Sequence, residues 1–407
     1  MPPSPAEKLM ARLDAFTAFT DVPGELTRLY LTRSHRAAAD QFARWCADAG
    51  LMPWIDAAGS VRARYEGKTF GAPALMIGSH IDTVRNAGRF DGNLGALAAL
   101  AVVEQLSETN VRLAHAIEIV AFGDEEGVRF PATLSGSRAI AGAFSTATLD
   151  QKDVGGITMR AALEAFGCEP HRVETLRRRD LAAFVELHIE QGPVLEAEGL
   201  ALGVVSAING ASRFAAKIEG MAGHSGTVPM AMRRDALVAT AEMTLAVEAR
   251  ANAEPDLVAT VGRLDVFPGA VNVVPGETRF TIDVRAPLDD MRRRAVADIS
   301  RSFHEIAARR KVGLSLVQTH DAPAYICHPR IVDGLSAAVS GLGLPSRLLP
   351  SGAGHDTMVM GAACPAGMLF VRCKGGVSHN PAESITLEDC GLALEALTRF
   401  AQAFTAD

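Results

Sequence analysis

The sequence lacks the features that would connect it to nucleic acid or to a membrane. Basic residues are not in excess: 40 lysines and arginines stand against 47 aspartates and glutamates, for a net charge of −7. Binding to a phosphate backbone needs a basic surface, so we expect no nucleic-acid partner. The longest apolar stretch, residues 96–103, is far shorter than the roughly 20 residues that cross a bilayer, so we expect no membrane partner.

Cysteine is also scarce and scattered. The six cysteines form no CxxC pair, which argues against a cysteine-based zinc site, and a disulfide framework is not expected in a chain of 407 residues. The first 16 residues lack the apolar core of a secretion signal. We therefore expect reduced thiols and a cytoplasmic location.

What the sequence does contain, in its first half, is an alternation of strand and helix patterns. Residues 74–78, 116–122 and 183–189 are short apolar runs typical of buried strands, and residues 94–106 repeat leucine and alanine at helical spacing. Such alternation favours an α/β layer around a largely parallel sheet. The chain is also long enough for two domains, because single cores rarely exceed roughly 250–300 residues.

The pattern changes between residues 211 and 325. The order there is strand, helix, strand, strand, helix, strand, which is the ferredoxin-like order. After residue 326 the α/β pattern resumes. We therefore predict a discontinuous α/β catalytic domain, residues 1–210 and 326–407, with a central, mostly parallel sheet. An inserted ferredoxin-like α+β domain would cover residues 211–325.

Two short motifs with metal-ligand character follow predicted strands or turns. In GSHIDTV, His80 and Asp82 point to one side at a strand end, and a carboxylate often holds the second nitrogen of a metal-binding imidazole. In GRFDGNLG, Asp91 lies between glycines, in a turn flexible enough to curl around a metal ion. Asp91 could equally cap the helix that follows. Each motif alone is weak, and a single H-x-D is more often structural.

An acidic triplet gives a sharper signal. Asp124, Glu125 and Glu126 directly follow the apolar run 116–122. Adjacent carboxylates at the end of a buried strand repel one another unless a cation compensates them. Two neighbouring glutamates can also divide the work, one binding a metal and the other moving protons.

Two histidines complete the pattern. His188 in ELHIEQG ends another predicted strand, and His379 lies in GGVSHNPAE. Each alone is more often a structural histidine, but ligands of α/β sheets bind at the carboxyl ends of the strands. Together, these imidazoles and carboxylates suit two borderline divalent ions such as zinc or manganese.

Six segments, in this order along the chain, resemble the hydantoinase/carbamoylase amidase branch of the M20 metallopeptidase superfamily: GSHIDTV, GRFDGNLG, GDEEGVRF, ELHIEQGPVLE, GHSGTVPM and GGVSHNPAE. This branch includes N-carbamoyl-L-amino acid hydrolases, allantoate amidohydrolases and microbial β-ureidopropionases. The resemblance runs from about residue 20 to the C-terminus. It implies cleavage of the N-carbamoyl (ureido) C–N bond of a small carboxylate substrate, with release of ammonia and carbon dioxide.

The resemblance further implies two divalent metal ions per subunit, zinc or manganese, with cobalt or nickel as alternatives. Asp91 would bridge the ions, with two ligands from other segments on each side. The implied ligands are His80, Asp91 and His188 for one ion, and Asp91, Glu126 and His379 for the other.

Other residues match the family's catalytic positions. Glu125 would act as general base and acid, Asp82 would orient His80, and His224 would polarise the scissile carbonyl. The inserted domain would be the dimerisation and lid domain of a homodimer. The residues that match substrate-binding positions are Gln191, Arg213, His224, Asn272, Arg285, Gly354 and His355.

Within that set, Asn272 and Arg285 resemble a pair that grips the substrate carboxylate, as an arginine fork can. Residues 210–213 depart from both the allantoate enzymes and the typical carbamoylases. Arg213 could contact a second polar group of the substrate or edge the lid. The identity of the ureido acid therefore stays open.

Two other functions remain open. An aminoacylase or dipeptidase of the same superfamily would use the same metals, but its members usually have a carboxylate in place of His188. A non-catalytic binding protein on the same fold would be expected to lose Glu125 or a ligand, and all are present. A serine hydrolase and a dinucleotide-binding enzyme are disfavoured, because GHSGT and residues 352–357 break the required motifs.

Overall fold

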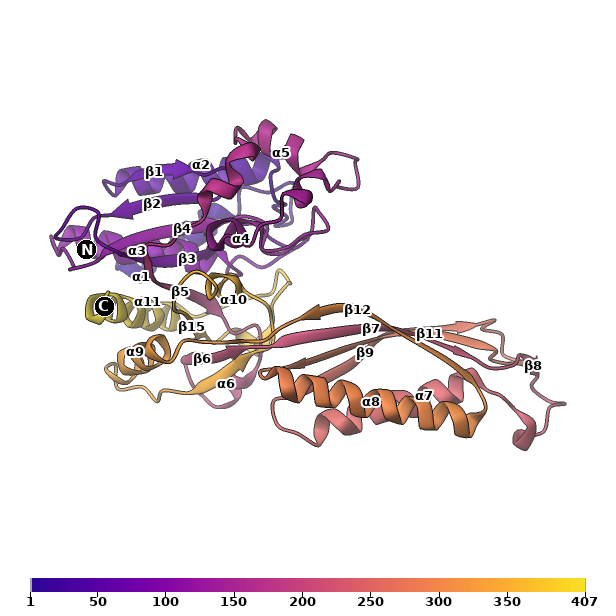
Figure 1. Ribbon diagram of the computed structural model, residues 1–407. Coiled ribbons are helices and arrows are strands. Elements are labelled where there is room, and N and C mark those ends of the chain that lie inside the picture. The colour runs from indigo at the N-terminus through magenta and orange to yellow at the C-terminus, as the bar shows by residue number, and fades with distance from the viewer. Residues whose placement is uncertain (1, 407) are drawn as a thin grey trace. The chain divides into compact units, whose positions relative to one another are not determined.

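The computed structural model describes residues 2–406 and divides into two units (Figure 1). Unit 1 consists of Met1–Ser206, Cys327–Leu349 and Gly354–Asp407. Unit 2 consists of Ala207–Ile326 and Pro350–Ala353. The chain thus leaves the first unit and returns to it.

A nine-stranded sheet runs through unit 1 in the order β1-β2-β4-β3-β5-β15-β6-β13, with β14 beside β6. Its strands are β1 (Met52–Ile55), β2 (Val61–Tyr65), β3 (Ala74–His80), β4 (Ala116–Phe122), β5 (Leu181–Ile189), β6 (Leu202–Ile208), β13 (Tyr325–Ile326), β14 (Leu348–Ser351) and β15 (Ala366–Val371).

Helices accompany this sheet. They are α1 (Pro5–Phe16), α2 (Arg33–Asp48), α3 (Asn93–Glu108), α4 (Ser135–Ala141), α5 (Met159–Phe166), α6 (Val194–Ala197), α9 (Pro329–Ser340), α10 (Asp356–Met360) and α11 (Leu387–Ala403). Short 3₁₀ helices cover Thr146–Asp150, Pro170–Leu176 and Lys374–Gly376. No helix in the described part of the chain combines the length and apolar character that a bilayer crossing requires.

The centre of the sheet is parallel. Strands β4, β3, β5 and β15 are neighbours and run in the same direction, whereas the pairs β1–β2, β2–β4, β15–β6 and β6–β13 are antiparallel. Every residue of β3, β4 and β15 is buried, as expected for strands covered on both faces. The predicted α/β fold with a central, mostly parallel sheet is confirmed, and antiparallel strands flank that centre.

The register of the parallel strands brings their carboxyl ends to one edge. His80, the last residue of β3, is paired with Phe122, the last residue of β4, so the acidic segment 124–126 begins beside His80. On the other side of β3, strand β5 ends one residue after His188. This edge is where α/β sheets bind their ligands.

Helix α3 approaches the sheet closely at Gly95. A Cβ atom at Gly95 would lie 2.2 Å from the main-chain oxygen of Leu187 and 2.7 Å from the Cβ of Ser79. A main-chain oxygen within a buried strand cannot move aside, so only glycine fits. The loop that precedes α3, which carries Asp91, is thereby held against β3 and β5.

We expect Gly95→Ala to lower the free energy of unfolding by about 1–3 kcal/mol through overpacking, although alanine is the better helix former. Denaturant and thermal unfolding of the metal-free protein measure this change. The matched control is Gly391→Ala in α11, where the nearest atom to the added Cβ would lie at 3.6 Å. That control should be neutral or gain up to about 1 kcal/mol; equal losses in both variants would contradict the packing argument.

Unit 2 has a four-stranded antiparallel sheet in the order β12-β7-β11-β9. The strands are β7 (Gly210–Glu219), β9 (Val258–Phe267), β11 (Glu277–Ala286) and β12 (Gly313–Ala322), and the helices are α7 (Ala236–Asn252) and α8 (Asp289–Arg310). This is the predicted ferredoxin-like order of elements. A second pair, β8 (Gly223–His224) with β10 (Val273–Val274), and a 3₁₀ helix, Met230–Met232, lie outside the sheet.

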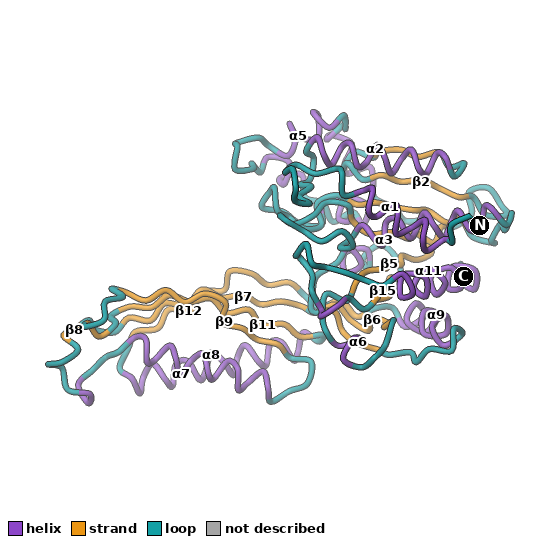
Figure 2. The backbone as a smooth tube through the Cα atoms, turned by 180° about the vertical axis from the view of Figure 1, so that it is seen from behind, coloured by secondary structure: helices purple, strands orange, loops and turns teal. Residues whose placement is uncertain are grey.

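The sheet of unit 2 has one covered face and one open face. Helices α7 and α8 pack on the same side (Figure 2), where apolar side chains such as Phe280, Ile282 and Phe303 form the core. Residues of β11 alternate between these faces, as strand geometry requires. Those of its open face are Arg279, Thr281, Asp283 and Arg285.

Unit 2 also includes a short segment, Pro350–Ala353, that the sequence pattern assigned to the catalytic domain. Two hydrogen bonds explain the attachment. The N–H of Asn209 donates to the main-chain oxygen of Ser351 at 2.9 Å, and Nη1 of Arg285 donates to that of Gly352 at 2.8 Å. Sequence patterning could not reveal these contacts, because the segment has no periodicity of its own.

Candidate metal centre

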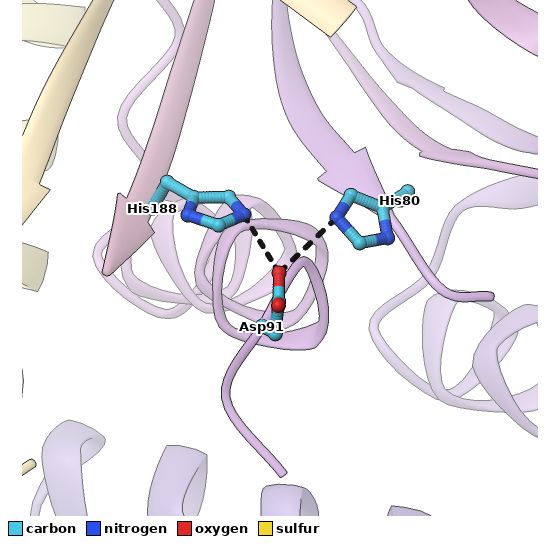
Figure 3. A group of neighbouring side chains, drawn as sticks. All are labelled: His80, Asp91 and His188. Carbon is cyan, nitrogen blue, oxygen red and sulfur yellow. Dashed lines mark ion pairs between the residues drawn. The ribbon is translucent and has the colours of Figure 1, made fainter. Parts of the chain in front are cut away.

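The two imidazoles at the strand ends face one carboxylate. Nε2 of His80, at the end of β3, lies 3.5 Å from Oδ1 of Asp91, and Nε2 of His188, near the end of β5, lies 3.1 Å from the same oxygen (Figure 3). All three side chains are buried. The three ligand atoms lie within 4.8 Å of one another, a spacing that one metal ion can occupy.

The other oxygen of Asp91 faces a different set of groups. Its Oδ2 lies 3.2 Å from Nε2 of His379, which in turn lies 3.7 Å from Oε2 of Glu126. Asp91, Glu126 and His379 form a second group with ligand atoms within 4.8 Å. The structure therefore brings together all five ligands expected from the sequence, with Asp91 common to both groups.

Main-chain oxygens hold the outer nitrogens of the two strand-end histidines. Nδ1 of His80 lies 3.0 Å from the main-chain oxygen of Asp82, and Nδ1 of His188 lies 2.9 Å from that of Ile189. Protonation at Nδ1 makes these contacts hydrogen bonds and leaves Nε2 as the free ligand atom. Both rings are thus turned toward Asp91.

Gly92 allows the Asp91 loop to lie against the ring of His80. A Cβ atom at Gly92 would lie 2.4 Å from the imidazole, and its φ of +64° favours glycine. The N–H of Gly92 also donates to Nε2 of His188 at 3.3 Å. Gly92 of the turn motif is therefore required both by its close contact with His80 and by its backbone conformation.

The expected role of Asp82 needs a correction. We predicted that its carboxylate would hold His80, but Oδ1 lies 3.8 Å from Nδ1, farther than the main-chain oxygen of the same residue. The carboxylate instead accepts the N–H of Glu125 at 3.1 Å and that of Glu126 at 3.2 Å. Two consecutive N–H groups match its two oxygens, so Asp82 orients the glutamate pair.

The electrostatics of the centre fit a cation. Burial raises the pKa of Glu126 to about 7, and the carboxylate of Asp91 adds to this shift. Burial also opposes ionisation of Asp91, yet hydrogen bonds from His188, His379 and His80 hold its pKa well below the usual value. Several acidic groups thus share one buried site, and a bound cation would offset their mutual repulsion. Imidazole and carboxylate donors in this number suit zinc or manganese.

Glu125 stands apart from the bridging carboxylate. Its Oε2 lies 4.0 Å from Nε2 of His80, and its side chain is 12% exposed. Burial raises the pKa of Glu125 well above its usual value, with a further contribution from Glu126, while His80 opposes the shift. A carboxyl group whose pKa is raised in this way is a better proton acceptor than an exposed glutamate, which suits a general base.

The third acidic residue of the triplet does not join the metal groups. Asp124 is fully buried and accepts a hydrogen bond from the hydroxyl of Ser135. Burial raises the pKa of Asp124 well above its usual value. The main chain at Asp124 has a φ of +66°, so the chain leaves the extended conformation of the strand at this residue. Only two of the three carboxylates therefore belong to the candidate site.

Sequence reasoning missed two residues that hold Asp91. Oε1 of Glu383 accepts the N–H of Phe90 at 2.7 Å and that of Asp91 at 3.1 Å. The hydroxyl of Ser378 lies 3.2 Å from Oδ2 of Asp91 and 2.9 Å from Oε2 of Glu383. Both residues lie in GGVSHNPAE, so the motif was noticed but only its histidine received a role.

Gln191 and His355, both expected near the substrate, lie beside the metal ligands. Nε2 of Gln191 donates to Oδ2 of Asp91 at 3.0 Å, and its buried Oε1 accepts no hydrogen bond from residues 2–406. The ring of His355 packs on that of His188, with centroids 4.5 Å apart. Gly354 directly precedes His355 and begins the last segment of unit 1.

The remaining predicted residues belong to unit 2 and lie at two ends of its sheet. His224 is paired with Val273, next to Asn272, beyond the end of β7. Arg285 is paired with Ala211 near the start of β7. Since Arg285 and Glu277 are eight strand positions apart, these two ends are separated by about 26 Å.

The expectation that Asn272 and Arg285 grip one substrate carboxylate stays a prediction, and it left open whether the two residues come from one subunit or from two. Within one chain the two side chains cannot grip the same carboxylate, because the length of β11 lies between them. Arg285 instead shares Asp283 with Arg213: Nε and Nη2 of Arg285 donate to it at 3.0 and 2.9 Å, and Nε of Arg213 donates at 3.0 Å.

Comparison with known protein families matches residues 76–403 to Peptidase family M20/M25/M40. The chain belongs to this family. The members of the M20/M25/M40 family are metal-dependent hydrolases, in agreement with the donor set around Asp91.

Relatives within the M20/M25/M40 family are similar over most of their length. N-carbamoyl-L-amino acid amidohydrolase of Geobacillus stearothermophilus is 40% identical over 376 residues, covering 92% of this chain and 92% of the relative. Allantoate deiminase 1 of Glycine max is 38% identical over 419 residues, covering 94% and 86%. A hydantoinase/carbamoylase family amidase from Burkholderia multivorans superposes with a TM-score of 0.93, at 33% identity and 98% coverage of both chains. The resemblance found in the sequence is confirmed.

The pKa of Glu126 predicts how metal binding by this M20/M25/M40 family member depends on pH. A carboxyl with a pKa of about 7 is protonated below that pH and must lose its proton to bind a cation. The apparent affinity should therefore fall as the pH drops below 7, by roughly tenfold per pH unit for each proton displaced. Calorimetric titration with Zn²⁺ between pH 5.5 and 8, in buffers of different ionisation enthalpy, measures both the affinity and the proton release. An affinity independent of pH would contradict the assignment of Glu126 as a group that must lose a proton to bind metal.

Proposed function

We propose that this protein is an amidohydrolase that cleaves the N-carbamoyl (ureido) C–N bond of a small carboxylate substrate. The observation that carries the proposal is the carboxylate of Asp91, whose two oxygens face different histidines in a buried site, with Glu125 beside it. The names of its relatives support this substrate class, since both N-carbamoyl amino acids and allantoate carry a ureido group next to a carboxylate.

Two divalent ions per subunit would complete the centre, zinc or manganese by the donor set, with cobalt or nickel as alternatives. Bound cations of this kind polarise a carbonyl oxygen and lower the pKa of a coordinated water to about 7. The residues that would hold one ion are His80, Asp91 and His188, and those that would hold the other are Asp91, Glu126 and His379.

Glu125 would move the protons of the reaction. Its carboxylate accepts a proton from the attacking water, whose oxygen forms a bond with the ureido carbon. The C–N bond then breaks, and Glu125 returns the proton to the departing nitrogen, which leaves as ammonia. The remaining carbamate decomposes to the amine and carbon dioxide. Asp82 fixes the main chain of Glu125 for this transfer.

Unit 2 would serve as the dimerisation and lid domain of a homodimer. His224 would polarise the scissile carbonyl, and Asn272 and Arg285 would bind the substrate carboxylate. A small ureido acid is much shorter than the roughly 26 Å between the ends of β11 that these residues mark. We therefore propose that His224 and Asn272 act on the substrate bound by the other subunit, and Arg285 on that of its own.

Arg213 bears on the choice of substrate. Its Nε is held by Asp283, while its two Nη atoms have no partner within residues 2–406, and the side chain is 49% exposed. Arg213 and Arg285 line the same cavity of about 650 Å³ on the open face of unit 2. The two guanidinium groups there favour a substrate that has a hydrogen-bond acceptor in addition to its carboxylate, as allantoate does.

The same metal centre would also serve an aminoacylase or dipeptidase, and a catalytically silent binding protein would keep the fold without turnover. The aminoacylase or dipeptidase is disfavoured by His188, where those enzymes usually have a carboxylate, and by the ureido substrates named for the relatives. The binding protein is disfavoured by the presence of Glu125 at the site. We place the protein in the cytoplasm, where its six free cysteines would stay reduced.

A substrate panel tests the reaction class. The metal-loaded enzyme should release ammonia from N-carbamoyl-L-amino acids, N-carbamoyl-β-alanine or allantoate, and should cleave N-acetyl amino acids and dipeptides at least about 100-fold more slowly in kcat/KM. We expect the highest kcat/KM with allantoate. Preferential cleavage of acetyl amino acids would favour the aminoacylase alternative, and metal binding without turnover of any compound would favour the binding protein.

Arg285→Ala should raise KM for carboxylate substrates by roughly 10- to 100-fold with a smaller change in kcat, because a charge-assisted hydrogen bond is lost. Arg279→Ala is the matched control. Arg279 lies on the same strand and open face but pairs with Glu277, so its loss should leave KM unchanged. An unchanged KM in Arg285→Ala would remove Arg285 from the substrate site.

Mixing two variants that are each impaired at limiting substrate tests whether the site is shared between subunits. His224→Ala and Arg285→Ala subunits, unfolded and refolded together, form mixed dimers in which one of two sites has both side chains. Random pairing should then restore about a quarter of wild-type activity at limiting substrate. Each variant refolded alone is the control. No recovery on mixing would mean that both residues serve one subunit's site.

A further inference from the structure

Arg28 is a buried cation whose hydrogen bonds all go to neutral groups. Its side chain has no exposed surface. Nε donates to the main-chain oxygen of Ile81 at 2.8 Å, Nη1 to that of Phe16 at 2.9 Å, and Nη2 to Oδ1 of Asn93 at 2.7 Å. Within the described chain no carboxylate accepts a hydrogen bond from this guanidinium, which is unusual because buried charges are normally paired.

Two of these acceptors lie in segments that carry candidate metal ligands. Ile81 stands between His80 and Asp82, directly after β3. Asn93 is the first residue of α3, two positions after Asp91. One guanidinium thus joins the segment of His80 to the segment of Asp91, the two ligands whose atoms lie 3.5 Å apart.

Further contacts make Arg28 a fixed point for these segments. Its N–H donates to the hydroxyl of Thr83 at 2.9 Å, and its main-chain oxygen accepts the N–H of Thr83 at 3.0 Å. The guanidinium also lies 4.3 Å from the ring centroid of Phe16 at the end of α1. Residues 81–83 are therefore tied to Arg28 through both main chain and side chain.

The charge of Arg28 also matters to an acidic site. Burial lowers the pKa of Arg28 to about 9, while Asp82 and Asp21 oppose the shift. The guanidinium stays charged at neutral pH, and its contacts with Ile81 and Thr83 hold the segment of Asp82, whose carboxylate in turn orients the two glutamates. A purely structural role would explain the burial, but it would not explain why the acceptors adjoin two metal ligands.

We propose that Arg28 is a positioning residue of the metal centre, which holds the segments of His80 and Asp91 at the separation that one cation requires. This inference rests on the metal centre of the proposed function. It makes a prediction that a structural role does not make, since residues that support metal ligands affect metal affinity by roughly 10- to 100-fold.

The test is metal binding by Arg28→Lys, which keeps the charge but cannot reach all three acceptors. Calorimetric titration of the metal-free protein with Zn²⁺ should give a dissociation constant roughly 10- to 100-fold higher than wild type. The visible absorption bands of Co²⁺ bound to the variant should also shift, because the angle between the His80 and Asp91 ligands changes. Neither readout depends on ureido hydrolysis.

Arg62→Lys is the matched control. Arg62 is also a buried arginine of unit 1, 4% exposed, but its Nε donates to Glu118 at 2.8 Å in the middle of β4, away from the ligand loops. This variant should lower the melting temperature and leave Zn²⁺ affinity and the Co²⁺ spectrum unchanged. An equal loss of metal affinity in Arg62→Lys would overturn the proposal, because general destabilisation would then explain both.

Asn93→Ala keeps the inference testable if Arg28→Lys does not fold. It removes only the acceptor of Nη2 and should weaken Zn²⁺ binding in the same direction by a smaller factor. The losses of Zn²⁺ affinity in the double variant should be smaller than the product of the two single losses, since Arg28 and Asn93 share a hydrogen bond. Unchanged Zn²⁺ affinity in a folded Arg28→Lys or Asn93→Ala protein would overturn the positioning role of Arg28 and leave the proposed function intact. A wild-type protein that binds no metal would overturn the proposed function as well.

Discussion

The interaction on which the site depends is the contact of Asp91 with histidines on both of its oxygens. A buried carboxylate without positive partners would be expensive to ionise. Here Oδ1 faces His80 and His188, and Oδ2 faces His379, so the carboxylate stays ionised and is common to two groups of side chains that could each hold a cation. A bound cation would also offset the repulsion among the neighbouring acidic residues.

That contact requires segments far apart in the chain to meet within a few ångströms. The parallel register of β3, β4 and β5 brings their ends to one edge, and two glycines let the Asp91 loop and α3 lie against them. Supporting groups then fix the main chain: Asp82 holds the glutamates, Glu383 holds Asp91, and Arg28 ties residues 81 and 93 together. The geometry of the ligands is set mostly by hydrogen bonds to residues that are not ligands themselves.

Unit 2 imposes a constraint of a different kind, the length of its strands. Ten-residue strands place the groups at their two ends too far apart for one small molecule. A site for one small molecule that used both ends would have to take them from two subunits, so the proposed homodimer would be needed for catalysis. The same open sheet face carries Arg213 and Arg285 around Asp283, so recognition of the acid and choice among ureido acids would lie in one cavity.

The sequence by itself determined the order and type of the elements and singled out Asp91 and the four side chains that gather around it. Strands β3, β4 and β5 were predicted within two residues of their bounds, because buried parallel strands are continuous apolar runs. The candidate ligands stood out because polar residues follow such runs directly. Only the tertiary structure decided which atoms meet. It assigned the carboxylate of Asp82 to the glutamates, separated Asn272 from Arg285, added Pro350–Ala353 to unit 2, and revealed Arg28 and Glu383. Such contacts depend on register and on distance in space, and neither is written in the spacing of residues along a chain.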